Sequence, residues 1–437
     1  MVNQELLIQR DLKHIWHPCT QMKDFETCPP LIINKAQGSY LYTNQGPIID
    51  AISSWWCKSL GHGAPEVIQA IQDQLHQFEH VIGANTTFPN LVELGETLAE
   101  ISGKQHLYLA SDGACAVEIA MKLSLHANQL KGRAHKKQFI SLTNSYHGET
   151  LGALSVSDLG KFKEPFIGLG VECHFIAPAY VLTQQDAEWH SCESYWEKLL
   201  PKLEAIKDNV CAVIVEPIVQ GGAGLLAYSA DFLRRLAQWA KTNDIYLIAD
   251  EIMTGLGRTG KWLACEHANV NPDMICLSKG LTSGSLPMSC VLLDHEIYQL
   301  FYADYAEGKS FLHSHTFSGN SLAVSAALAT LKSMKALKID EKAEQLGTWL
   351  QDYFQQVSSA SGKLTNLRSI GAWVAGDLIA QPGERLGFKV YQEALQRGAL
   401  LRPLGNTLYW LPPLTMEKET IGKLAEITLN SIEAAYK

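Results

Sequence analysis

The chain has 437 residues, of which 46% are hydrophobic and 19% are charged. A chain of this length exceeds the usual size of one domain, so we expect two domains and a large buried core. The formal net charge of -9 is spread without long acidic blocks and without Lys/Arg-rich runs. This balance argues against nucleic acid and an anionic membrane as partners, and it leaves a small molecule as the expected ligand.

The cysteines and the amino terminus bear on the compartment. The ten cysteines are scattered and form no C-x-x-C pair, which is typical of reduced thiols, so we expect neither disulfide bonds nor zinc. Residues 1–5 do not begin a secretory signal, and no apolar run approaches the roughly 18 residues of a membrane span. The sequence therefore predicts a soluble cytoplasmic protein.

The segment 1–59 contains two strand-like pieces, at 31–33 and 40–42. They are too few to form a core of their own, so we expect this segment to pack with one of the two domains, the smaller one. Residues 332–437 predict that smaller domain, of the α+β type. Its expected helices are 341–358, 389–396 and 418–436, and its expected strands are 372–379 and 408–411.

Residues 60–331 alternate short apolar runs with helix-period segments such as 116–130 and 231–242. This alternation predicts an α/β domain with a mainly parallel sheet that is covered by helices on both faces. The expected strands are 106–110, 139–143, 212–216, 246–250, 274–277 and 289–293.

Two residues at strand ends point to a cofactor. Asp250 ends one predicted strand, and Lys279 follows another. A lysine amine can bond to the aldehyde of pyridoxal phosphate, and an aspartate beside the pyridine nitrogen keeps that nitrogen protonated, so that the ring accepts electrons. We therefore predict pyridoxal 5'-phosphate as the cofactor.

The phosphate of such a cofactor needs a binding turn. Gly113 and Ala114 lie where the strand 106–110 turns into a helix, whose exposed N–H groups and dipole suit a phosphate. Taken alone, the pattern is more typical of an ordinary strand-to-helix turn. The phosphorylated cofactor implied by Lys279 reverses that preference, so we predict Gly113 and Ala114 as phosphate contacts.

Two further side chains follow predicted strands. Tyr146 follows the strand 139–143, at the sheet edge where ligands of open α/β folds bind, and its ring could stack on the pyridine. A tyrosine in a surface loop explains the same pattern equally well. Glu216 ends the strand 212–216 and could orient groups around the cofactor, although a solvated acid at a strand end is nearly as good an explanation.

The run 255–261 satisfies G-x-G-x-x-G and comes within one residue of a P-loop. Trp262 occupies the place of the P-loop Ser or Thr, and the residues 250–254 separate the glycines from the strand. We interpret the run as a glycine-rich active-site loop that carries Arg258. The absence of H-E-x-x-H, G-x-S-x-G and EF-hand spacings gives no support for a metal site or for serine hydrolysis.

Together, these motifs resemble the class III pyridoxal-phosphate-dependent aminotransferases of fold type I over nearly the whole chain. The likeness is most specific to the biotin-biosynthesis branch at 14–18, 53–56, 216–221 and 401–405, and at Tyr409. The resemblance implies a mainly parallel seven-stranded sheet in a large cofactor domain, 60–331, and a small α+β domain, 332–437. It also implies amino transfer from S-adenosylmethionine to 8-amino-7-oxononanoate, which gives 7,8-diaminononanoate.

The resemblance implies a role for each matched position. Lys279 would hold the cofactor and move a proton, Asp250 would pair with the pyridine nitrogen, and Tyr146 would lie near the ring and the substrates. Glu216 and His315 would also contact the cofactor. Thr316 would reach the phosphate from the neighbouring subunit, which implies a homodimer with shared active sites. The implied substrate contacts are Trp55, Trp56, Tyr146, Lys279, Ser314, Arg402, Tyr409 and Cys19.

Among these contacts, Arg402 would pair with a substrate carboxylate, and the tryptophans would line an aliphatic chain. Some positions depart from the family pattern. Cys19 replaces a tyrosine, Ser314 and His315 replace glycine and proline, and Ala114 replaces a common serine. Tyr409 is retained, which favours S-adenosylmethionine over lysine as the donor.

Other functions stay open at this point. Another class III ω-aminotransferase, using ornithine, 4-aminobutyrate or lysine, would keep Lys279 and Asp250 but would not need the tryptophan pair. A nicotinamide-dependent dehydrogenase would rest on the glycines of 255–260 alone. A cofactor-binding protein without turnover would not need Lys279.

Overall fold

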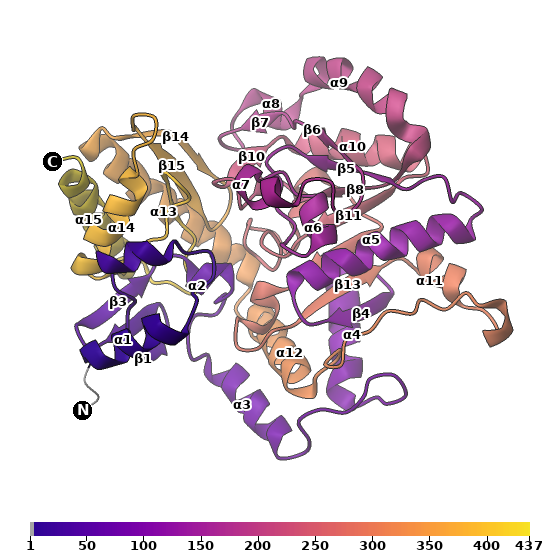
Figure 1. Cartoon of the computed structure of the whole chain (residues 1–437), viewed down its shortest axis with the longest axis horizontal. Helices are drawn as coiled ribbons and strands as arrows, with labels where there is room; N and C mark the ends of the chain where they lie inside the picture. The colour runs from indigo at the N-terminus through magenta and orange to yellow at the C-terminus, as the bar shows by residue number, and fades with distance from the viewer. Residues whose placement is uncertain (1–3) are drawn as a thin grey trace.

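The computed structural model describes residues 4–437. Residues 1–3, which belong to the stretch from which we expect no secretory signal, lie outside the described part. Figure 1 shows the first and last elements of the chain on the same side of the molecule, beside a larger group of central elements. In the range 4–437, no helix is both long and apolar enough to cross a membrane.

A seven-stranded sheet forms the centre of the larger group, with the strand order β4-β13-β12-β11-β8-β5-β6. Its strands β12, β11, β8, β5 and β6 pair in parallel, whereas β13 runs antiparallel to both of its neighbours. The prediction of a mainly parallel seven-stranded sheet is therefore confirmed. The strands are β4 (His106–Ala110), β5 (Gln138–Leu142), β6 (Cys173–Ile176), β8 (Val210–Val215), β11 (Tyr246–Asp250), β12 (Met274–Leu277) and β13 (Ser289–Leu293).

Helices cover both faces of this sheet, and its central strands β8, β11, β12 and β13 are therefore buried throughout. On β8, Ile214 packs in the cluster that contains α5 (Gly113–Leu130), whereas Val213 and Val215 pack in the cluster that contains α10 (Ala230–Thr242). The alternation follows from the two-residue period of a strand. The other helices are α1 (Gln4–His14), α2 (Ser53–Trp56), α3 (Pro65–Leu75), α4 (Pro89–Ser102), α6 (Leu151–Ser155), α7 (Gly160–Lys163), α8 (Ala187–His190), α9 (Glu193–Ile206), α11 (His295–Phe301) and α12 (Ser321–Ala336).

The two ends of the chain build a second group of elements together. β3 (Gly46–Asp50) pairs in parallel with β16 (Ala399–Leu400), so residues near position 50 lie beside residues near position 400. The sheet order is β1-β2-β3-β16, and a second sheet has the order β14-β15-β17. These elements are β1 (Ile33–Gln37), β2 (Tyr40–Thr43), β14 (Leu364–Ser369), β15 (Val374–Leu378), β17 (Thr407–Trp410), α13 (Ile339–Ser361), α14 (Leu386–Arg397) and α15 (Lys418–Ala435); β7 (Tyr180–Val181), β10 (Leu226–Tyr228) and β9 (Val219–Gln220) form a further small sheet.

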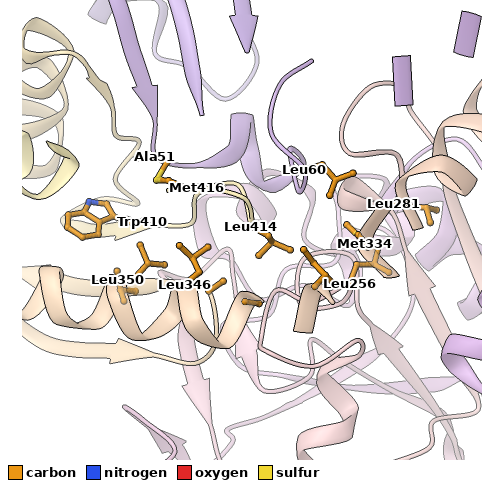
Figure 2. Close-up of a cluster of buried hydrophobic side chains, with 14 of the residues drawn as sticks. Ala51, Leu60, Leu256, Leu281, Met334, Leu346, Leu350, Trp410, Leu414 and Met416 are labelled. Atoms are coloured by element: carbon orange, nitrogen blue, oxygen red, sulfur yellow. The ribbon is translucent and has the colours of Figure 1, made fainter. Parts of the chain in front are cut away.

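One buried cluster runs between the two groups of elements (Figure 2). It joins side chains from the N-terminal segment, from α13 and β17, and from residues near the large sheet: Ala51, Leu60, Leu256, Leu281, Met334, Leu346, Leu350, Trp410, Leu414 and Met416. Burial of apolar area stabilises a fold by roughly 25 cal/mol per Å², so this cluster fixes one group of elements on the other. Because the core is continuous there, the domain limits after residues 59 and 331 stay a prediction.

Several elements differ from expectation. The strand expected at 31–33 begins only at Ile33, and β3, β6 and β14 are not among the expected strands. β14 alternates little, because its sequence Leu364–Ser369 carries Thr, Asn and Arg, and its exposure is uneven. A sequence pattern detects such half-exposed strands poorly because their pairing depends on neighbours that are distant in the chain.

Candidate active site

A cavity of about 620 Å³ opens where the strands of the large sheet end. Its walls carry residues that follow β4, β5, β8, β11 and β12. Ligands of open α/β sheets bind at this edge. The lining residues that carry chemistry are Asp112, Gly113, Ala114, Tyr146, His147, Glu149, Glu216, Asp250 and Lys279 from the large-sheet side, and Cys19, Trp55, Trp56, Arg402 and Tyr409 from the other side.

Lys279 stands in the wall of this cavity, in a strained backbone conformation with φ of 43°. Residues other than glycine seldom adopt a positive φ, and such strain gathers at functional sites. The Nζ atom lies 5.1 Å from the ring centroid of Trp56. Burial lowers the pKa of Lys279, against the opposing charges of Asp250 and Glu216. A lowered pKa makes the neutral, nucleophilic amine more accessible.

Asp250 is buried at the end of β11 and is oriented by a histidine. Its Oδ2 atom lies 2.7 Å from Nδ1 of His147, and its Oδ1 atom accepts a hydrogen bond from the backbone N–H of Ile252 at 3.2 Å. The His147 side chain is buried as well, so water does not compete for this hydrogen bond. His147 therefore fixes the direction of the carboxylate. The sequence pattern gives His147 no role, although its place beside Tyr146 after β5 is the signal that could have suggested one.

Glu216 lies in the cavity wall and accepts hydrogen bonds from two loops. Its Oε2 atom accepts a hydrogen bond from the N–H of Tyr146 at 2.9 Å, and its Oε1 atom accepts one from the N–H of Gly221 at 2.9 Å. Burial raises the pKa of Glu216 to about 7. The Tyr146 hydroxyl donates to Oε1 of Glu149 at 3.0 Å, and burial raises the pKa of that tyrosine as well. Glu216 thus sets the position of Tyr146.

The N-terminus of α5 faces the same cavity. Asp112 caps the helix by accepting a hydrogen bond from the N–H of Cys115 at 3.0 Å, so the N–H groups of Gly113 and Ala114 precede the capped position. The loop after β5 packs tightly here, because a Cβ atom at Gly148 would lie 2.6 Å from Cβ of Ala114. This packing places the helix start against the loop that carries Tyr146.

The opposite wall is built from tryptophan, arginine and tyrosine. The guanidinium Cζ of Arg402 lies 4.4 Å from the ring centroid of Trp55, and its Nη2 donates to the carbonyl of Cys19 at 3.1 Å. Trp56 donates from Nε1 to the hydroxyl of Tyr409 at 3.1 Å. The Sγ atom of Cys19 lies 3.8 Å from Oε1 of Glu149. The wall therefore presents a cation beside apolar aromatic surface.

Three predicted contacts lie elsewhere in the described chain. Within residues 4–437, the cavity lining does not include Ser314, His315 or Thr316. Although burial raises the pKa of Asp112, hydrogen bonds from Cys115 and Ser111 and the charge of His315 hold it below its usual value. Thr316 is exposed on the surface.

Arg258 corrects the interpretation of the glycine-rich run. Its side chain is buried, and Nη1 donates to the carbonyls of Ala372 at 2.8 Å and Pro412 at 2.9 Å. Burial lowers the pKa of Arg258 to about 9. The run 255–261 therefore joins the large-sheet side to the residues around β15 and β17, and it is a structural connection rather than an active-site loop.

The cavity residues fit pyridoxal phosphate. A lysine with a lowered pKa, a buried carboxylate and the N-terminus of a long helix all face one space, as covalent attachment, the pyridine nitrogen and the phosphate require. The fit rests on side chains that come from five strand ends, so it does not depend on any one motif. Of the sequence-based candidates on the large-sheet side, the cavity brings together Gly113, Ala114, Tyr146, Glu216, Asp250 and Lys279.

Comparison with known proteins decides the family. The family model described as aminotransferase class-III matches residues 22–432 of the chain. The chain belongs to the class III aminotransferases. Enzymes of this class use pyridoxal phosphate, so the predicted cofactor and enzyme class are confirmed.

This class III aminotransferase is similar over nearly its whole length to relatives in several organisms. It is 37% identical over 425 residues to the adenosylmethionine-8-amino-7-oxononanoate aminotransferase of Helicobacter pylori, with 96% of each chain covered. It is 34% identical over 423 residues to the protein of the same name from Aquifex aeolicus, with 94% of this chain and 93% of the other covered.

Solved structures agree with the fold. The aminotransferase matches the crystal structure of adenosylmethionine-8-amino-7-oxononanoate aminotransferase from Methanocaldococcus jannaschii with a TM-score of 0.92, at 30% identity and 99% coverage of both chains. It also matches an omega transaminase from Pseudomonas jessenii in complex with PMP, with a TM-score of 0.90, at 25% identity and 98% coverage of both chains.

Glu251, another buried carboxylate of this aminotransferase, gives a prediction about pH. Glu251 accepts hydrogen bonds from Thr254 Oγ1 at 2.6 Å and from the N–H groups of Ala264 at 3.0 Å and Cys265 at 2.9 Å. Burial raises its pKa from 4.5 to about 7. The folded state therefore binds more protons than the unfolded state between these values, and the stability that this difference contributes is present below pH 4.5 and is lost as the pH rises through 7.

The variant Glu251→Gln should lack this pH-dependent loss of stability, because glutamine does not titrate. We expect the stability advantage of the wild type over the variant to fall by up to about 3 kcal/mol between pH 5 and pH 8, because one pKa unit corresponds to about 1.4 kcal/mol. Thermal unfolding across this pH range measures the difference. Glu426→Gln makes the same substitution at an exposed position and serves as the control. A constant difference for Glu251→Gln would contradict the raised pKa.

Proposed function

We propose that this aminotransferase transfers the amino group of S-adenosylmethionine to 8-amino-7-oxononanoate and forms 7,8-diaminononanoate for biotin synthesis. The observation that carries the proposal is the position of Arg402, stacked on Trp55 across the cavity from the cofactor residues. A guanidinium beside aromatic surface suits a substrate with a carboxylate at the end of an aliphatic chain. The names of the relatives from Helicobacter pylori and Methanocaldococcus jannaschii support the same reaction.

The large-sheet side of the cavity performs the chemistry in this proposal. Bound pyridoxal phosphate supplies an electron sink for the carbon that loses its proton. Lys279 would hold the cofactor, and its Nζ would take the proton from the donor carbon. Asp250, oriented by His147, holds a proton at the pyridine nitrogen. Gly113 and Ala114 bind the phosphate through their N–H groups.

The opposite wall binds the acceptor. Arg402 pairs with the acceptor carboxylate, while Trp55 and Trp56 exclude water from its carbon chain. Tyr409 holds Trp56 by accepting the hydrogen bond that Nε1 of Trp56 donates at 3.1 Å, and Tyr146 lines the same cavity. Cys19 leaves more room than a tyrosine would, and its thiol faces Glu149. Both substrates are small molecules, and the free state of the cysteines suits a cytoplasmic enzyme.

The proposal includes a homodimer with shared sites. Thr316 is exposed within a segment whose large apolar side chains are also exposed, namely Tyr305 at 98%, Leu312 at 89% and Phe317 at 63%. Such side chains gather where another protein surface covers them. A second copy of the chain on this surface would bring Thr316, with Ser314 and His315, toward the phosphate and substrate space of its partner.

The donor is tested by absorption spectroscopy of the purified protein. S-adenosylmethionine alone should convert the long-wavelength band of the bound cofactor to the pyridoxamine band, because the donor half-reaction needs no acceptor. Lysine and 4-aminobutyrate, added in parallel, should leave the band unchanged. Lys279→Ala is the control, and it should show neither the band of the attached cofactor nor turnover. Conversion by lysine or 4-aminobutyrate instead would still indicate an aminotransferase, but it would reject S-adenosylmethionine as the donor.

Arg402→Ala tests the acceptor site. We expect its kcat/KM for 8-amino-7-oxononanoate to fall by a factor that corresponds to about 2 kcal/mol or more, because the substrate carboxylate loses its partner. Steady-state kinetics at saturating donor measure the change. Arg385→Ala is the matched control, because that arginine pairs with Asp24 and does not line this cavity. Unchanged kinetics for Arg402→Ala would remove Arg402 from the site.

Complementation between two inactive variants tests the shared site. Lys279→Ala removes the attachment point, and Thr316→Asp places a negative charge toward the partner's phosphate. In a mixed dimer, one site contains both changes and the other contains neither, so co-expression should restore about half of the wild-type activity per mixed dimer. Purified mixed dimers that carry two different tags allow the measurement. No recovery in such dimers would place Thr316 in its own subunit's site.

A further inference from the structure

The two tryptophans of the acceptor wall lie in a strained turn. Ser53, Ser54, Trp55 and Trp56 all have a positive φ, of 50°, 45°, 71° and 71°. Side chains with a Cβ atom disfavour this left-handed conformation, and a run of such residues is rarer than a single one. Nearby contacts must therefore hold the turn.

A buried cluster of polar side chains provides those contacts. The Asp50 carboxylate, fully buried at the end of β3, accepts hydrogen bonds through Oδ1 from the N–H groups of Ile52 at 3.2 Å and Ser54 at 3.0 Å. Its Oδ2 atom accepts from Ser54 Oγ at 2.7 Å and from His62 Nε2 at 2.8 Å. The carboxylate thus bonds both to the backbone of the turn and to a side chain outside it.

The composition Ser, His and Asp could also indicate a nucleophile, but the geometry does not fit one. Ser54 Oγ lies 2.7 Å from the carboxylate and 3.4 Å from His62 Nε2, and the same Nε2 already faces Asp50. In a catalytic triad the histidine joins the serine to the aspartate through its two different ring nitrogens. The arrangement is that of a cluster around one buried carboxylate.

The turn connects this cluster to the acceptor wall. Asp50 is the register partner of Leu400 in the parallel pair β3–β16, so the chain after each strand leaves the same sheet edge. The segment after β3 carries Trp55, and the segment after β16 carries Arg402, whose guanidinium lies 4.4 Å from the Trp55 ring. Ser53 Oγ also donates to the carbonyl of Leu411 at 2.8 Å. A shift of the turn would therefore move Trp55 relative to Arg402.

We propose that Asp50, Ser54 and His62 are positioning residues that hold the left-handed turn and thereby set the affinity of the acceptor wall for a carboxylate on an aliphatic chain. The inference rests on the proposed role of Arg402. None of the three residues lines the cavity within the described chain, so they act through Trp55 and Trp56 rather than by touching the substrate.

The test measures binding without turnover. Nonanoate, a saturated nine-carbon carboxylate without the ketone and the amine, is titrated into the holoenzyme by calorimetry. His62→Phe removes the donor to Asp50, and Ser54→Ala removes the Oγ donor while leaving the backbone strain. We expect each variant to bind nonanoate about tenfold more weakly than the wild type, because each loses a hydrogen bond to a charged group. His62→Gln, which keeps a donor near the place of Nε2, should recover most of the affinity.

Controls separate positioning from general loss of stability. His267→Phe makes the same substitution at a histidine away from the turn, where it removes a hydrogen bond from Nε2 to the carbonyl of Thr259 at 2.9 Å. It should keep the wild-type affinity, and the absorption band of the bound cofactor should be unchanged in all of these variants. If His62→Phe fails to fold, Ser54→Ala decides alone.

Each outcome decides one of two questions. Wild-type affinity in Ser54→Ala and His62→Phe, together with lost binding in Arg402→Ala, overturns the positioning role and leaves the proposed function in place. Wild-type affinity in Arg402→Ala overturns the carboxylate site and the inference with it. Equal weakening in His267→Phe also overturns the inference, because it would show that loss of a histidine hydrogen bond away from the turn has the same effect.

Discussion

The candidate active site of this aminotransferase brings a small group of ionisable side chains into one buried space. Asp250 and Glu216 lie out of water, and each is held by hydrogen bonds from neighbouring residues while Lys279 faces them. A buried charge without a partner is costly, so such groups persist only where the fold fixes their partners. The parallel strands meet this requirement, because their carboxyl ends meet at one edge and bring distant segments together. The sheet therefore determines which ionisable side chains lie side by side in the cavity.

The parts of the site that depend on a local sequence pattern could be predicted from the sequence. The apolar strands β4, β11, β12 and β13 begin and end where their residues predict, and Lys279 and Asp250 follow from their places at strand ends. His147 could not be assigned in this way, because its role lies in one hydrogen bond to a residue more than a hundred positions away. The glycine-rich run misled for the opposite reason, since a short motif was read without the packing that buries Arg258.

The wall of Trp55, Trp56 and Arg402 shows why resemblance and residue chemistry supplied different information. Composition and spacing gave no reason to join Trp55 with Arg402, because their neighbourhood is created by the parallel pairing of β3 with β16. The family pattern marked both positions, but it did not predict the left-handed backbone conformation of residues 53–56. The four successive residues with positive φ include donors of hydrogen bonds to the Asp50 carboxylate, and propensities that count residues one by one do not represent such a set.

The pairing of β3 with β16 also has a consequence for the folding of the chain during its synthesis on the ribosome. Trp56 and Tyr409, which are hydrogen-bonded in the finished enzyme, are 353 positions apart in the chain. The N-terminal strands emerge early and must wait for nearly the whole chain before their edge is covered. Contacts of such long sequence separation form late and leave unpaired strand edges exposed. The edge of β3 can therefore be covered only after residues 399–400 of β16 have been synthesised.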